Sequence, residues 1–266
     1  SHTRPGTLLK HQIPMRTFSE WDDERPGFVE IGLVGHEGGT SSGDFLQSLD
    51  VTDVSSGWTE VVGLRNKAQV WVLDGLKQIR SRLPFDLLGI DSDNGGEFIN
   101  RMLFEYCQNE KITFTRSRPH RKNDNCFVEQ KNWSIVRRFV GYQRLDTDDE
   151  LVLLNELYSQ LRLYANYFQP VMRLKTKGRQ GASVKRTYFM PETPYSRLLR
   201  STYLTNPQKQ RLRNQYEKLN PAQLKRRIDK LQSQLLLLAT KRKTIKQRTP
   251  TPWYETNDIF YNKDRS

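Results

Sequence analysis

The sequence predicts an α/β domain built on a mixed, five-stranded sheet flanked by helices and followed by a basic, mostly helical C-terminal extension. Two patterns predict it: strand-like runs come first and then alternate with helical runs, and positive charge is concentrated after residue 174. The chain has 266 residues, enough for a well-packed domain of about 150 residues with an appendage.

Three runs rich in β-branched and aromatic residues open the domain, at 28–35, 44–54 and 58–64. Clusters of Gly, Ser and Thr at 37–43 and 55–57 separate them. Short polar turns between such runs are typical of antiparallel hairpins, so the three runs predict a meander.

Beyond the meander, strands and helices alternate. Helical spacing is present at 66–82 and helices are also expected at 97–109, 127–142 and 149–168, with short strands at 85–90 and 112–115. Alternation of this kind implies parallel pairing. A polar loop, 116–125, precedes the third of these helices.

Four segments are expected from composition: a lead-in at 1–26, the core at 27–170, a basic region at 171–248 and a tail at 249–266. The mixture of proline, glycine and charge in the lead-in is typical of a linker, so a helix-turn-helix domain before Ser1 is plausible. The basic region holds a helix at 221–246, with Asn220 as its cap and Pro221 at its first position.

That helix carries one apolar seam, formed by Leu224, Ile228, Leu231, Leu235, Leu238 and Ile245. The seam is compatible with a helix packed on its own domain and equally with a helical hairpin or a self-associating helix.

The net charge of +13 is unevenly distributed, because residues 1–174 carry −3, residues 175–248 carry +17 and residues 249–266 carry −1. A basic excess confined to one segment indicates a polyanionic partner, most simply nucleic acid. The alternative is a solvated basic tail. The densest clusters are Lys175, Lys177 and Arg179, then Lys185 and Arg186, which we expect to follow a DNA backbone.

Two cysteines, Cys107 and Cys126, form no CxxC pair, and the four histidines lack the spacing of zinc ligands. The longest apolar run, 235–239, is far shorter than the ~20 residues that span a bilayer. A reducing, cytoplasmic location is therefore expected.

Asp93 and Glu129 are the candidate catalytic pair. Asp93 lies in Ile-Asp-Ser-Asp-Asn-Gly, directly after a predicted strand, and Glu129 lies in the first turns of the helix that follows the polar loop. Thirty-five residues separate the two. Carboxylates at such positions can converge on divalent ions for phosphodiester chemistry.

The meander, the Ser-Asp-Asn-Gly-Gly-Glu-Phe motif and the Asn-Asp-Asn-Cys-Phe-Val-Glu-Gln-Lys-Asn-Trp motif together resemble the Asp-Asp-Glu transposases and retroviral-type integrases. The likeness extends over 26–199 and is greatest to bacterial insertion-sequence transposases. It implies a ribonuclease-H-like fold, two Mg²⁺ (or Mn²⁺) ions held by Asp93 and Glu129, and cleavage and strand transfer of element ends. The resemblance also implies that the protein binds double-stranded DNA, both element ends and target. It implies a homo-oligomer assembled on that DNA and a location at the nucleoid.

Gly32 stands where the resemblance places the first of the three acids. Losing a carboxylate shared by two ions predicts little or no strand transfer, with metal binding weakened. Glu30, two residues earlier on the same strand face, and Asp50 on the neighbouring strand are alternative acids. Lys122, Asn123, Asn125 and Lys131 are the expected DNA contacts near the site, although each is compatible with an ordinary polar surface.

Three functions fit these features. The first is a transposase or integrase core impaired at Gly32, and the second is a non-catalytic DNA-binding and assembly protein that retains the fold. A nuclease acting on RNA–DNA hybrids is the third, and the Asn-Gly and Glu-Gln-Lys-Asn-Trp motifs disfavour it.

Overall fold

The computed structural model describes residues 7–15, 22, 24–118, 125–180 and 183–248. A five-stranded sheet forms its centre, in the order β3-β2-β1-β4-β5. The strands are β1 (Phe28–Gly35), β2 (Gln47–Asp53), β3 (Thr59–Leu64), β4 (Gly89–Ser92) and β5 (Thr113–Arg116). β2 is antiparallel to β1 and β3, whereas β4 is parallel to β1 and β5. This is the mixed sheet of a ribonuclease-H-like fold, as the sequence predicts.

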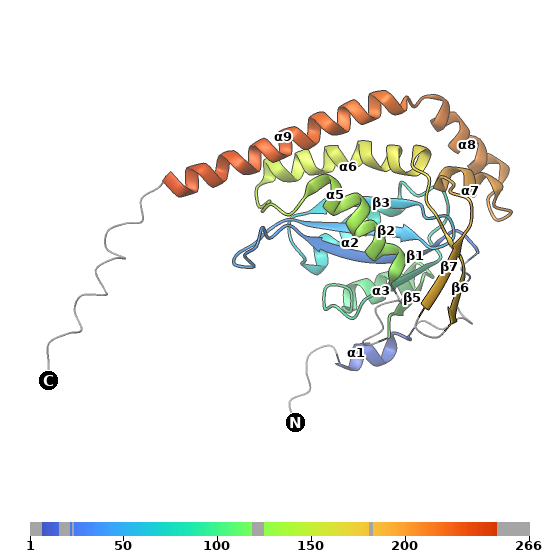
Figure 1. The fold of residues 1–266 in the computed structure, drawn as a ribbon. Coiled ribbons are helices and arrows are strands. Elements are labelled where there is room, and N and C mark those ends of the chain that lie inside the picture. The colour runs from blue at the N-terminus through green and yellow to red at the C-terminus, as the bar shows by residue number, and fades with distance from the viewer. Residues whose placement is uncertain (1–6, 16–21, 23, 119–124, 181–182, 249–266) are drawn as a thin grey trace, which may run out of the picture.

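Helices cover both faces of the sheet (Figure 1). One face packs on α2 (Gln69–Arg80) and α3 (Arg101–Asn109), and the other on α6 (Asp148–Phe168) and on a helix formed by α4 (Cys126–Lys131), η1 (Asn132–Arg137) and α5 (Arg138–Val140). Side chains alternate along β1, so Val29 and Ile31 face α2 and α3, whereas Val34 faces α6. Glu30 and Gly32 therefore face the helix that carries Glu129.

The basic region is more structured than the sequence suggests. It begins with a hairpin of β6 (Leu174–Gln180) and β7 (Ser183–Tyr188) and continues through α7 (Pro194–Arg200), α8 (Asn206–Glu217) and α9 (Pro221–Arg248). The sequence of 183–190 favours a strand, which β7 confirms, whereas β6, α7 and α8 were not predicted. Tyr195 of α7 and Tyr216 of α8 stack with ring centroids 4.8 Å apart.

The α9 helix lies along α6 as an outer layer of the domain (Figure 1). Four residues of the predicted seam are buried there, namely Leu224, Ile228, Leu231 and Leu235, and Ala239 continues the stripe in place of Leu238. Of the two alternatives left open by the sequence, the structure has the helix packed on its own domain.

Several predicted boundaries were wrong. The strand expected at 85–90 is observed at Gly89–Ser92, after a loop that buries Phe85 and Leu87. The helix expected from residue 97 begins at Arg101, because Asn100 caps it by accepting from the Leu103 N–H. The lead-in is also not wholly extended: it holds α1 (Thr7–Gln12) and buries Ile13 in the core.

None of the helices among the described residues is long and apolar enough to cross a membrane.

Candidate active site and DNA-binding surface

Asp93 lies at the end of β4, on a turn fixed by polar contacts. Its carboxylate accepts from the Gly95 N–H at 2.8 Å, and the Asn94 amide donates to the Ser117 carbonyl at 2.9 Å. Arg116 in turn donates to the Asn94 side chain at 3.3 Å. The Asp93 side chain itself is exposed at the carboxyl end of the strand, as predicted.

Asn125 joins this turn to the start of α4. In the amide orientation that satisfies both of its polar atoms, it donates to Asp91 Oδ2 at 3.1 Å and accepts from the Asp93 N–H at 3.3 Å. Its backbone carbonyl accepts from the Glu129 N–H at 3.1 Å. One residue thus connects the segments that carry the two candidate acids, and Glu129 is exposed on the first turn of α4.

Glu30, on β1, forms hydrogen bonds to the first turn of α4. Its carboxylate is fully buried and accepts from the N–H groups of Phe127 and Val128 at 2.9 and 3.0 Å. These N–H groups have no partner within the helix, so the acid completes the hydrogen bonding of the first turn. The structure therefore gives Glu30 a capping position, which engages the carboxylate that the sequence offered as an alternative metal ligand.

Gly32 lies beside that helix with no side chain to fill the space. A Cβ atom there would meet Asn132 Nδ2 at 3.1 Å and a Val128 methyl at 3.2 Å. Asn132 Oδ1 is buried without a hydrogen-bond partner among the described residues. Position 32 thus points toward η1, where an acid would meet an amide.

Asp50 is paired directly with Gly32 across β1 and β2, and it is fully buried. Burial raises its pKa to about 7, against the opposing effects of the Thr52 hydroxyl and of Lys131. Its Oδ2 has no hydrogen-bond partner among the described residues. A carboxyl group that readily keeps its proton is a poor replacement for an ionised metal ligand.

The residues present do not fit a two-metal centre. Within the described part of the chain, no three His, Cys, Asp or Glu side chains come together in a way that could hold an ion. Asp93 and Glu129 supply two carboxylates, Glu30 is engaged by α4, and Gly32 supplies none.

The predicted DNA contacts have different outcomes. Asn125 and Lys131 are buried, so they offer little surface to DNA. Burial also lowers the pKa of Lys131 to about 8, an effect that the charge of Asp50 opposes. Lys122 and Asn123 lie outside the described residues, as does the side chain of Lys177. Lys175, Arg179, Lys185 and Arg186 are exposed on the β6–β7 hairpin.

The six-residue π-helical segment η1, directly after α4, was not predicted. π-Helical segments are rare in proteins as a whole, and those that occur are often found at functional sites. Here η1 places Asn132 against position 32 and leaves Trp133 63% exposed. The polar Asn-Trp pair after Glu129 was the available signal in the sequence, although it does not reveal the π geometry.

Comparison with known proteins gives one curated sequence relative and several structures with a similar fold, while no protein-family model matches the chain. An uncharacterized protein of Sinorhizobium fredii, y4rM, is 44% identical over 192 residues, which cover 72% of this chain and 55% of that protein. The chain therefore spans about half the length of this curated relative.

Among solved structures, the HTLV-2 integrase catalytic core domain in complex with magnesium aligns over 56% of this chain and 93% of its own, with 15% identity and a TM-score of 0.43. The catalytic core domain of BIV integrase covers 64% of this chain and 91% of its own, with 17% identity and a TM-score of 0.42. A chain of a simian T-cell lymphotropic virus intasome in complex with the PP2A regulatory subunit B56 gamma covers 60% of this chain and 55% of its own, with 15% identity and a TM-score of 0.45.

Proposed function

We propose that this chain is a DNA-binding protein with a transposase- or integrase-type core, whose metal-dependent cleavage and strand transfer of element-end DNA are impaired by glycine at position 32. The observation that carries the proposal is the placement of Gly32. Gly32 lies on β1, next to β4, which Asp93 directly follows. A side chain at position 32 would point toward the helix that carries Glu129.

The surroundings of Gly32 support an acid as the residue suited to this position. Asn132 Nδ2 would lie 3.1 Å from a Cβ atom at position 32, and an amide N–H is a suitable donor to a carboxylate. Both contacts are tight for a Cβ atom, so the Asn132 amide and the buried Val128 side chain would each have to shift by a few tenths of an ångström. Asp93 and Glu129 remain exposed and supported by Asn125.

The alternative is a catalytically inactive DNA-binding and assembly protein, and one observation favours it. Neither of the two nearby acids is free to replace the missing one, because Glu30 caps α4 and burial raises the pKa of Asp50 to about 7. The β6–β7 hairpin is independent of these acids, so DNA binding would survive without chemistry.

The test is a cleavage assay on supercoiled plasmid DNA with Mg²⁺ or Mn²⁺. We expect no nicking by the unmodified protein and metal-dependent nicking by Gly32→Asp. The double variant Gly32→Asp/Asp93→Asn is the matched control, and it should lose the restored activity.

Nicking by the unmodified protein that Asp93→Asn abolishes would contradict the impairment. An inactive Gly32→Asp protein that folds and binds DNA would instead favour the assembly function. A chain that binds no DNA would contradict both functions.

A further inference from the structure

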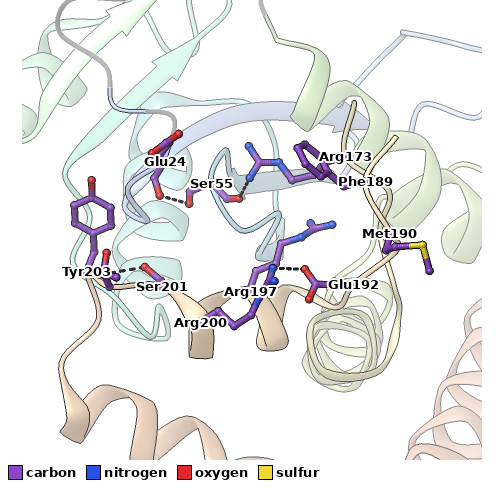
Figure 2. Close-up of a pocket in the computed structure, with 11 residues that line it drawn as sticks. Glu24, Ser55, Arg173, Phe189, Met190, Glu192, Arg197, Arg200, Ser201 and Tyr203 are labelled. Carbon is purple, nitrogen blue, oxygen red and sulfur yellow. Dashed lines mark hydrogen bonds and ion pairs between the residues drawn. The ribbon is translucent and has the colours of Figure 1, made fainter. Parts of the chain in front are cut away.

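Figure 2 shows a cavity of about 710 Å³ whose lining includes Arg173, just before β6, and Phe189, just after β7. The turn between β2 and β3 forms one wall through Ser55, and this turn bonds to the first residue of β1 through the Val54 N–H. Asp93, in contrast, follows the carboxyl end of β4, which runs parallel to β1. The cavity and the acid pair therefore lie toward opposite ends of these strands.

Arg173 and Arg197 bring two positive charges into this cavity (Figure 2). Arg173 donates to the Ser55 carbonyl at 2.7 Å, and Arg197 donates to the carbonyls of Ser56 and Val171. Neither guanidinium forms an ion pair with a described carboxylate. Arg200, at the rim, does pair with Glu192.

Two guanidinium groups share this pocket with the carboxylates of Glu24 and Glu192, which offset the repulsion between the two positive charges only in part. Burial first, and then the charge of Arg173, lower the pKa of Arg197, with Glu192 opposing. Their hydrogen bonds to carbonyls fix both planar groups in place and leave other N–H groups for a ligand. A preorganised pair of this kind suits a phosphate, which guanidinium binds with two parallel hydrogen bonds.

The cavity is continuous with the basic hairpin. Arg173 directly precedes β6, and Phe189, which also lines the cavity, directly follows β7. The ammonium group of Lys175 lies 5.6 Å from the centre of the Phe189 ring. Exposed cations thus continue from the hairpin, through Lys175, to the two partly buried arginine side chains.

We propose that the Arg173–Arg197 pocket binds a phosphate of the DNA backbone and anchors the strand that contacts the β6–β7 hairpin. This inference rests on the proposed function insofar as the ligand is DNA, but it requires no catalysis. The hydroxyl groups of Ser201 and Thr202 line the same cavity and can add hydrogen bonds to phosphate oxygens.

The experiment measures the binding of a fluorescent DNA duplex by anisotropy over a series of salt concentrations. Arg173→Gln removes one charge while its amide can still donate to the Ser55 carbonyl; we expect affinity to fall about tenfold. The slope of log affinity against log salt should become shallower by about 0.9. Arg173→Lys keeps the charge and should keep the slope.

Arg101→Gln is the matched control, because it removes the same charge from an exposed position on α3, where Arg101 pairs with Glu105. It should leave affinity and slope nearly unchanged. Thermal unfolding of each variant verifies that the proteins are folded.

Equal effects of Arg173→Gln and Arg101→Gln, in a protein that binds DNA, would overturn the pocket and leave the proposed function standing. Inorganic phosphate and a free nucleotide are titrated in parallel. Binding of either through Arg173 without any change in DNA affinity would assign the pocket to a small phosphate ligand and overturn the DNA assignment. A wild-type chain that binds no DNA would overturn both.

Discussion

At the residue scale, the site combines what the sequence can predict with what only the fold reveals. Motif spacing was sufficient to single out Asp93 and Glu129, and the family resemblance then pointed to Gly32. The positions of Glu30 and Asp50 depend on strand pairing and on burial under α4, which no local pattern encodes. Sequence therefore predicted where an acid is replaced, whereas the surroundings of Glu30 and Asp50 required the structure.

Asp50 gives the fold a specific pH dependence. Burial raises its pKa from the ordinary 3.8 to about 7, so between these values the unfolded chain releases a proton that the folded chain retains. Its contribution to stability is fully present below pH 3.8 and is lost as the pH rises through 7. Lys131 and Glu30 are the charged groups that act on it.

Asp50→Asn removes this titration. The difference in the free energy of unfolding between this variant and the unmodified protein should grow by about 2 to 4 kcal/mol, in favour of the variant, from pH 4 to pH 7.5. Urea unfolding across that range measures the difference. The exposed Asp74→Asn is the control, and a flat difference for both variants would contradict the buried, protonated state of Asp50.

Glu30→Gln tests the capping position. One carboxylate oxygen accepts two N–H groups of α4, and the variant weakens these charge-assisted bonds, so unfolding should become easier by roughly 1.5 to 3 kcal/mol. Glu105→Gln, in an exposed pair with Arg101, should cost less than about 1 kcal/mol. If urea unfolding shows equally small losses of unfolding free energy for Glu30→Gln and Glu105→Gln, Glu30 is not a structural cap.

At the scale of elements, predictions succeeded where periodicity was strong. The seam of α9 was visible in the sequence, yet its partner, α6, was not, because a heptad pattern does not say which surface it packs on. β6 was missed since its exposed run of Lys, Thr and Gly lacks the apolar alternation of a half-buried strand. The π-helical geometry of η1 likewise depends on tertiary packing.

The packing of α9 predicts that the basic region cannot be removed without damage to the core. Ile228 is completely buried between α9 and α6, so Ile228→Ala should reduce the free energy of unfolding by about 2 to 5 kcal/mol. Leu236, which is 51% exposed on the same helix, provides the control, and Leu236→Ala should change stability by less than about 0.5 kcal/mol. Urea unfolding with no loss for Ile228→Ala would mean that α9 is detached in solution.

At the scale of the whole molecule, an acidic core and a basic extension form one structure. Residues 1–174 carry −3 and residues 175–248 carry +17, and the exposed Lys175, Arg179, Lys185 and Arg186 lie on the β6–β7 hairpin. Composition predicted this polarity directly. It did not predict that α7 and α9 would pack against the core.

Neutralising the hairpin should therefore weaken DNA binding without unfolding the protein. The triple variant Arg179→Gln/Lys185→Gln/Arg186→Gln should make the salt slope shallower by about 2 to 3, in proportion to the phosphates released. Lys67→Gln/Lys77→Gln/Arg101→Gln, outside the hairpin, removes the same charge. Identical slopes for the two triple variants would show that the hairpin makes no special contribution.

The central claim is that glycine at position 32 removes an acid from a site that is otherwise supported. Electron paramagnetic resonance of Mn²⁺, titrated to millimolar concentration into the unmodified protein and into Gly32→Asp, tests it most directly. We predict saturable Mn²⁺ binding by Gly32→Asp that Asp93→Asn abolishes, and no such binding by the unmodified protein. Equal, Asp93-dependent binding by both proteins would contradict the claim.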